Sequence, residues 1–226
     1  MALEVDWPAA AAVFGAVTQG LGAIAVAIVG GLGLSTWKQQ LRGTRSQALA
    51  EDALSLVYRV VDAIGHMRQP FALAGEMKSV HRGEEESEED FDLRKEYGVV
   101  EIRYQQHAEV ASQLAALRFR VRAALGKEAQ DAIEEILKVL RGVRNEAAAA
   151  GRLKKIMLHH AHLLDRYPSD DQIKAYEGSR DRLAQAEDRV WAADPEFDNV
   201  VHELSEAVTR AEAALRSFAT VGRSAA

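Results

Sequence analysis

A long stretch near the N-terminus contains no charged side chain. From Pro8 to Trp37 there is no Asp, Glu, Lys or Arg, and nearly every residue is apolar. About 20 such residues in helical form cross the roughly 30 Å hydrocarbon core of a bilayer. A helix that is apolar on all sides has too few partners in so small a protein to be buried as a core helix. The pattern therefore predicts a transmembrane anchor over residues 1–37.

The residues around this stretch predict that the anchor is retained and oriented. No basic residue precedes it, as the start of a cleaved signal peptide would require, whereas Lys38, Arg42 and Arg45 follow it. Lys and Arg mark the cytoplasmic flank of a span, so we expect the N-terminus outside and the rest of the chain in the cytoplasm, at a bacterial inner membrane. Trp7 and Trp37 bracket the stretch, where indole rings settle at the two interfaces.

Small residues recur on one face of the expected anchor at spacings of three and four. This face includes Ala16, Gly20, Ala23 and Ala27. Small side chains let membrane helices approach closely, which favours self-association. A segment so rich in Ala and Gly also produces these spacings by chance, so a plain anchor and an associating helix both remain open.

Beyond a basic joint at 38–45, apolar residues recur every three or four positions. Four such stretches run from Leu49 to Met67, from Tyr97 to Leu125, from Ala129 to Leu163 and from Phe197 to Phe218, the last with the seven-residue repeat of a coiled coil. A weaker one starts near Asp170 and reaches Val190. Amphipathic helices need one another to bury their apolar faces. We therefore expect an all-α fold, an antiparallel helical bundle over 46–220, followed by a flexible tail at 221–226.

Local signals indicate where these helices begin and end. Pro70 closes the first, Gly126 separates the second from the third, and Pro168 stops the third after about 40 residues, or about 60 Å. The third changes phase near Gly151, and Asp194-Pro195 has the form of an N-cap followed by a first helical residue.

An acidic block interrupts the pattern between the first two stretches. It runs from Gly83 to Asp90 without a basic residue. Like charges repel and bury nothing, so we expect a solvated loop at about 82–92. The alternative is a docking strip for a basic partner.

Composition excludes several classes of function. The 226 residues include no cysteine, which rules out disulfides, thiol catalysis and Cys-containing zinc or iron–sulfur sites. Four prolines and 6% aromatic residues argue against a β-sandwich or barrel. The net charge of −6 is the opposite of what a nucleic-acid-binding domain carries, so no nucleic acid is expected as a partner.

Motifs for catalysis are missing from the sequence. There is no phosphate-binding glycine loop, nucleophile elbow, H-E-x-x-H or Glu-x-x-His pair. His159, His162 and Asp165 fall at i, i+3 and i+6 of a helix, and two imidazoles plus a carboxylate are ligands for zinc or iron. A fourth ligand is not identified, and histidines on a polar face are commonly just solvated. We expect no catalytic residue, metal, cofactor or small-molecule substrate.

Both ends of the chain resemble an uncharacterised bacterial family of single-pass membrane proteins. The resemblance rests on a Trp-x-x-Gln-Leu-x-Gly joint at 37–43, a helix at 50–64 ending in Asp-Ala-Ile, an Arg-x-Pro-Phe closure at 68–71, and a last helix at 194–215. It implies an N-terminal anchor and a cytoplasmic helical domain. It implies no activity.

These observations predict a non-enzymatic membrane protein that presents a cytoplasmic helical interaction module. Its expected partners are the lipid bilayer and either another protein or a second copy of the chain. The alternative is a homo-oligomeric pore or membrane effector built from the small-residue face. A metal enzyme using His159 and His162 is a third hypothesis.

Overall fold

The computed structural model describes residues 40–41 and 43–219, and in this part of the chain every regular element is a helix. The first helix covers 40–67, with residue 42 not described. The others are α2 (Ala74–Ser79), α3 (Glu88–Leu125), α4 (Lys127–Arg166), α5 (Asp170–Val190) and α6 (Asn199–Ala219). The predicted all-α fold is confirmed for the described residues.

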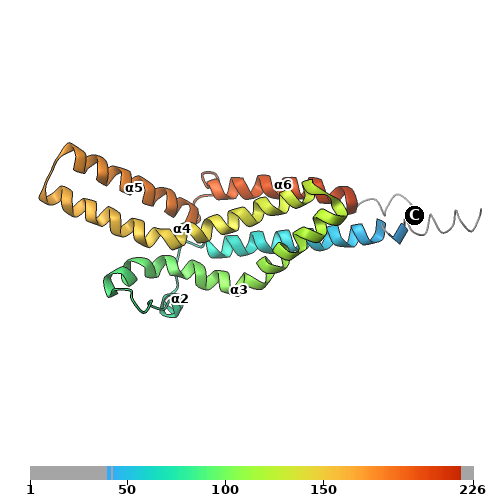
Figure 1. The fold of residues 1–226 in the computed structure, drawn as a ribbon, viewed down its shortest axis with the longest axis horizontal. Coiled ribbons are helices and arrows are strands. Elements are labelled where there is room, and N and C mark those ends of the chain that lie inside the picture. The colour runs from blue at the N-terminus through green and yellow to red at the C-terminus, as the bar shows by residue number, and fades with distance from the viewer. Residues whose placement is uncertain (1–39, 42, 220–226) are drawn as a thin grey trace, which may run out of the picture.

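The helices form an elongated rod, and α4 spans most of its length (Figure 1). The first helix and α6 lie along one half of α4, and α5 lies along the other half. The first helix starts, and α6 ends, at the same end of the rod, which we call the proximal end. The turn between α4 and α5 lies at the opposite, distal end.

A helical bundle with an apolar core forms the proximal half. The first helix, α3, α4 and α6 each contribute completely buried side chains, such as Val57, Leu114, Ile133 and Leu215. Leu114, Ile133 and Leu215 belong to the apolar stripes that the sequence pattern predicted. In the first helix that pattern included Leu56 and not Val57, whereas Val57 is the completely buried residue and Leu56 is only partly buried. Because burying a large aliphatic side chain contributes about 1.5–3 kcal/mol, this shared core holds the four helices together.

Caps explain the boundaries of several helices. Ser87 and Ser169 each accept a hydrogen bond from a backbone N–H of the following turn, at Asp90 and Gln172, so each satisfies an unpaired donor at a helix start. Between α3 and α4, Gly126 has a φ of 105°, a conformation that side chains disfavour. Gly126 therefore separates the helices where the sequence predicted.

The phase change near Gly151 does not interrupt α4, which is continuous there. A Cβ atom at Gly151 would lie 2.9 Å from the Cα atom of Arg94 in α3, so only glycine permits this approach. Beyond this point the partly buried Leu153 and Met157 still pack against the hydrophobic core. The phase change in the sequence therefore coincides with the close approach of α3 to α4 at Gly151.

Three local expectations differ from the structure. The described part of the joint at 38–45 is already helical, so the first helix starts earlier than residue 46. The expected acidic loop at about 82–92 is helical from Glu88 onward, because Ser87 caps α3. The last helix starts after Asp198 and not at Asp194-Pro195, because Asp198 makes the capping hydrogen bonds.

Residues 40–41 and 43–219 include no helix that is both long and apolar enough to cross a membrane. Several predicted features lie outside the described residues: the anchor at 1–37 with Trp7 and Trp37, the flanking Lys38 and Arg42, the small-residue face of Ala16, Gly20, Ala23 and Ala27, and the tail at 221–226. The third flanking residue, Arg45, is exposed on the first helix.

Candidate functional site: the polar junction and the distal arm

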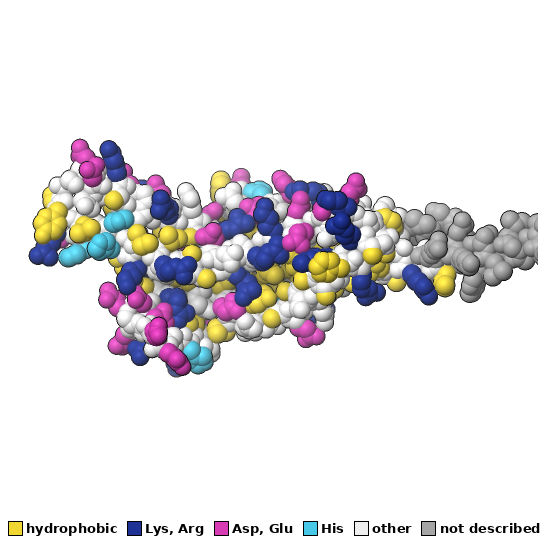
Figure 2. All heavy atoms as spheres, viewed as in Figure 1, with side chains coloured by type: hydrophobic (Ala, Val, Ile, Leu, Met, Phe, Trp, Pro, Cys, Tyr) yellow, Lys and Arg dark blue, Asp and Glu magenta, His cyan; other side chains and the backbone are white. Residues whose placement is uncertain are grey.

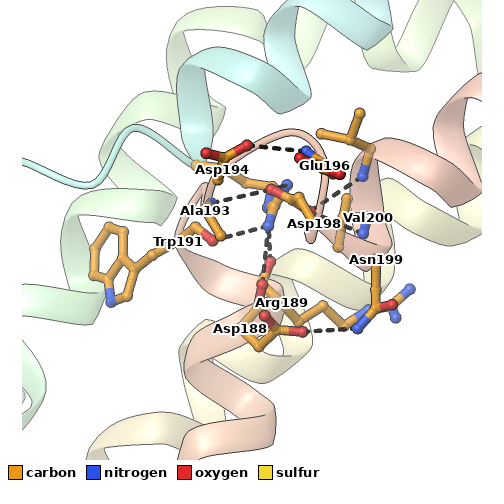
Figure 3. A network of polar contacts seen from close by, with 11 residues as sticks. Asp188, Arg189, Trp191, Ala193, Asp194, Glu196, Asp198, Asn199 and Val200 are labelled. Atoms are coloured by element: carbon orange, nitrogen blue, oxygen red, sulfur yellow. Dashed lines mark hydrogen bonds and ion pairs between the residues drawn. The ribbon is translucent and has the colours of Figure 1, made fainter.

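Three chain segments meet in the middle of the rod at a buried ion pair. The first helix has just ended, α5 ends at Val190, and α6 begins at Asn199. Arg68 and Asp198 meet here with side chains 3% and 0% exposed, and their atoms Nη1 and Oδ2 are 2.9 Å apart. Figure 3 shows Asp198 beside the backbone of the α5–α6 connection. We call this cluster the polar junction.

The N–H groups of the Arg68 guanidinium that face α5 donate hydrogen bonds to backbone carbonyl groups. Nε donates to Arg189 O at 2.9 Å, and Nη2 donates to Asp188 O at 2.9 Å and to Trp191 O at 2.8 Å. The last carbonyls of a helix lack intrahelical partners and carry partial negative charge. Arg68 therefore closes the C-terminus of α5 from a different helix.

Asp198 accepts hydrogen bonds from the backbone N–H groups at the start of α6. Its Oδ1 accepts hydrogen bonds from the backbone N–H groups of Val200 and Val201, and its Oδ2 accepts one from Ala193. Burial alone would raise the pKa of Asp198, but the hydrogen bonds from Arg68, Ala193 and Val201 outweigh it and lower that pKa below its ordinary value. Asp198 is therefore ionised at neutral pH.

The polar junction has the properties of a structural fastening. Both charged groups are buried and hydrogen-bonded, so neither presents a proton or a lone pair to a reactant. Arg68 also accepts, through its backbone carbonyl, a hydrogen bond of 2.7 Å from the N–H of Ala192. The cluster fixes the end of the first helix to the α5–α6 connection.

A second buried arginine fastens the connection between the first helix and α3. Arg103 of α3 is 1% exposed and donates to both carboxylate oxygens of Glu76 in α2, each at 2.9 Å. It also donates to the carbonyls of Gln69 and Phe71. The hydrogen bonds from Arg103 lower the pKa of Glu76 to about 2. This pairing explains how the short helix α2, which buries no side chain, is held in place.

Two histidines lie between the first helix and α3. His66 Nδ1 and His107 Nε2 are 3.0 Å apart and both rings are partly buried. A hydrogen bond at this distance requires one ring nitrogen without a proton. Burial lowers the pKa of His66, its neighbours His107 and Arg103 lower it further, and the charge of Glu76 opposes them.

The histidines singled out in the sequence lie elsewhere. His159, His162 and Asp165 are exposed on the outer half of α4. Within the described residues, no three His, Cys, Asp or Glu side chains are grouped so that they could hold a metal ion. The metal-enzyme hypothesis therefore gains no support from the geometry.

An open groove of about 740 Å³ runs between α4, α5 and α6. Ion pairs cross it: Arg189 is 2.7 Å from Glu203, and Arg210 is 2.7 Å from Glu135. Its charged groups thus neutralise one another across the helix contact. This is the arrangement of a solvated helix interface.

The distal end offers a different surface. Residues 151–182, in the outer parts of α4 and α5, form what we call the distal arm, whose tip extends past the start of α3 (Figure 1). It exposes large apolar side chains, namely Ile156, Leu158, Tyr167 and Ile173. Ile156 and Leu158 are two positions apart on α4, so they lie on different sides of that helix. Periodicity did not identify these apolar side chains as exposed, because Ile156 and Ile173 fall on the predicted apolar stripes, where they have the same pattern as buried residues.

No family model, no curated protein and no solved structure matches the chain. The resemblance to a bacterial membrane protein family therefore stays a prediction.

Proposed function

We propose that this protein is a non-enzymatic, single-pass membrane protein that holds a helical interaction module in the cytoplasm. The uncharged stretch from Pro8 to Trp37 supports the anchor. The basic residues Lys38, Arg42 and Arg45 that follow support a cytoplasmic orientation. The two buried arginine clusters support a structural role for the most buried polar groups of the bundle.

The observation that carries the proposal is the position of the start of the first helix relative to the uncharged stretch. The first helix starts at the proximal end, and the uncharged stretch ends only three residues before it. An anchor there would place the proximal end at the bilayer. Since α4 has 40 residues, or about 60 Å, the distal arm would then stand far from the lipid and face the cytoplasm.

Charge insertion tests the anchor in the full chain. Gly20→Arg with Ala23→Arg should move the protein from the membrane fraction to the soluble fraction, because each Arg costs about 2.5–3.5 kcal/mol at the centre of a span. The matched control, Gly20→Leu with Ala23→Leu, should stay in the membrane. A wild-type protein that is found in the soluble fraction would overturn the proposal.

A fusion tests the orientation separately. A reporter that is active only in the cytoplasm, joined after Ala226, should be active. In inverted vesicles the cytoplasmic face of the membrane points outward, so added protease should digest the bundle. A bundle that is not digested would show that the module faces the other way.

A further inference from the structure

One face of α4 is covered by α3 along part of its length and continues beyond the start of α3. The start of α3 lies against α4 at Gly151, and Asp90 of α3 pairs with Lys155 at 2.6 Å. The same face continues outward with a spacing of three and four residues, which keeps its members in one row. We call this row the arm face; it consists of Arg152, Lys155, His159, His162 and Arg166, all exposed.

The arm face has the chemistry to receive an acidic segment. It contains three cations and two imidazoles, and the one carboxylate of α4 beside its outer end is Asp165. Ile156 and Leu158 flank it and are 46% and 45% exposed, so it offers apolar contact beside the charges. The ion pair between Lys155 and Asp90 already shows the group that this face accepts.

The chain itself carries a segment of matching chemistry. Residues 84–92 include seven carboxylates and no basic residue; we call them the acidic segment. Glu84, Glu85 and Glu88 are exposed and make no ion pair with any described residue. On the face shown in Figure 2, acidic side chains gather over the start of α3, and His side chains gather on the arm among basic and acidic ones, both at the distal end.

Within one molecule the acidic segment reaches only part of the arm face. It is fixed at the start of α3, because Glu86 accepts hydrogen bonds from Arg94 at 2.6 and 2.8 Å and from the N–H of Gly83. From Lys155 the arm continues to Arg166, about 16 Å further along the helix. The acidic segment therefore has surplus negative charge, and the outer arm face has uncovered positive charge.

We propose that a second copy of this chain binds at the distal end, with the acidic segment of each copy against the arm face of the other. Such a contact is self-complementary, as a two-fold dimer requires. The inference deepens the proposed function and rests on it, since anchors in one membrane hold the distal ends of two copies at the same height. Complementary charges of this kind make association sensitive to salt.

A charge exchange in the full-length protein tests this contact. One variant carries Arg152→Glu and Arg166→Glu, and the other carries Glu84→Arg and Glu85→Arg. Each variant alone places like charges opposite one another in both halves of the dimer, so its self-association should weaken by roughly tenfold or more. In a mixture, each acidic surface again meets a basic one, so heterodimers should form with about the wild-type affinity.

The measurement uses the full chain in detergent micelles, with the two variants carrying different fluorophores. Energy transfer between fluorophores reports heterodimers, and light scattering reports the mass of each sample at low and at high salt. The matched control is Arg59→Glu with Arg120→Glu, which changes two exposed arginines of the first helix and α3 away from the arm. It should associate like the wild type, and circular dichroism should show equal helix content in all variants.

Three outcomes would overturn the inference. A wild type that is monomeric at low salt excludes a second copy as the occupant. A dimer that survives in both single-variant samples is held by another surface, such as the small-residue face of the anchor. A mixture without heterodimers shows that the two surfaces do not meet. A protein that is absent from the membrane refutes instead the proposed function, through the fractionation experiment.

Discussion

At the scale of single residues, Arg68 and Asp198 are the groups on which the junction depends most. They are 130 residues apart in sequence, yet each satisfies the backbone at one end of a different helix. A buried ion pair is weak evidence for net stabilisation, because desolvation opposes the attraction. Breaking one is different, since the remaining charge stays buried without its partner. Loss of either side chain therefore tests the junction directly.

We predict that Arg68→Met destabilises the protein by about 3–5 kcal/mol, because it leaves the Asp198 carboxylate buried without a counter-charge. For a chain of this size the loss lowers the Tm by roughly 10 °C. Thermal unfolding of the full chain, followed by circular dichroism, measures it. The control Arg59→Met removes an exposed arginine of the first helix and should change stability by less than about 0.5 kcal/mol. Equal effects of the two changes would contradict a role of the junction in stability.

At the scale of elements, the contact between the first helix and α3 contains a titratable pair. The pKa of His66 is lowered in the folded protein, first by burial and then by His107 and Arg103 from α3, while Glu76 of α2 opposes the shift. The unfolded chain therefore binds a proton at His66 more readily than the folded chain does. As the pH falls through about 6.5, the ordinary pKa of histidine, this difference disfavours the folded state.

We predict that lowering the pH from 7.5 to 5.5 weakens the folded state by up to about 1 kcal/mol through His66. The variant His66→Gln should show a smaller loss over the same interval, because Gln does not titrate. Urea unfolding of the full chain at the two pH values measures both. His162→Gln, on the exposed face of α4, should keep the wild-type pH dependence. The prediction is wrong if His66→Gln and the wild type lose the same stability.

At the scale of the whole molecule, the length of α4 sets the distance between the proximal and distal ends. Its 40 residues run unbroken through the close approach at Gly151. The first helix and α6 lie along one half of it and α5 along the other, while α3 runs beside most of its length (Figure 1). A helix of this length keeps the distal arm apart from the proximal core, which the proposed function requires.

We predict a distance of about 55 Å between spin labels at the two ends of α4, since each residue adds about 1.5 Å. The absence of native cysteine lets Glu128→Cys and Asp165→Cys, both exposed, be labelled without other changes. Double electron–electron resonance on the full chain, at a labelled fraction low enough to suppress contacts between copies, measures the distance. A value below about 40 Å would mean that α4 bends back on itself near Gly151.

The sequence by itself determined the helical class and most helix boundaries. Apolar periodicity and local stop signals are properties of neighbouring residues, so Gly126 and Pro168 marked the ends of α3 and α4 correctly. The same reasoning failed at Asp194-Pro195, where the local signal is good but Asp198 caps α6. Two candidate caps four residues apart cannot be ranked locally, because the choice depends on Arg68 from a distant segment.

Only the tertiary structure decided which polar residues act together. The pairs Arg68–Asp198, Arg103–Glu76 and His66–His107 join segments far apart in the chain, and nothing in the spacing of their residues along the sequence indicates them. The packing also decided which side chains stay exposed. In sequence, the row from Arg152 to Arg166 looks like any solvated helix face. It stays uncovered because α3 starts beside Lys155 and covers no more of the row. Exposure is set by where neighbouring helices end, and that is a property of the assembled fold.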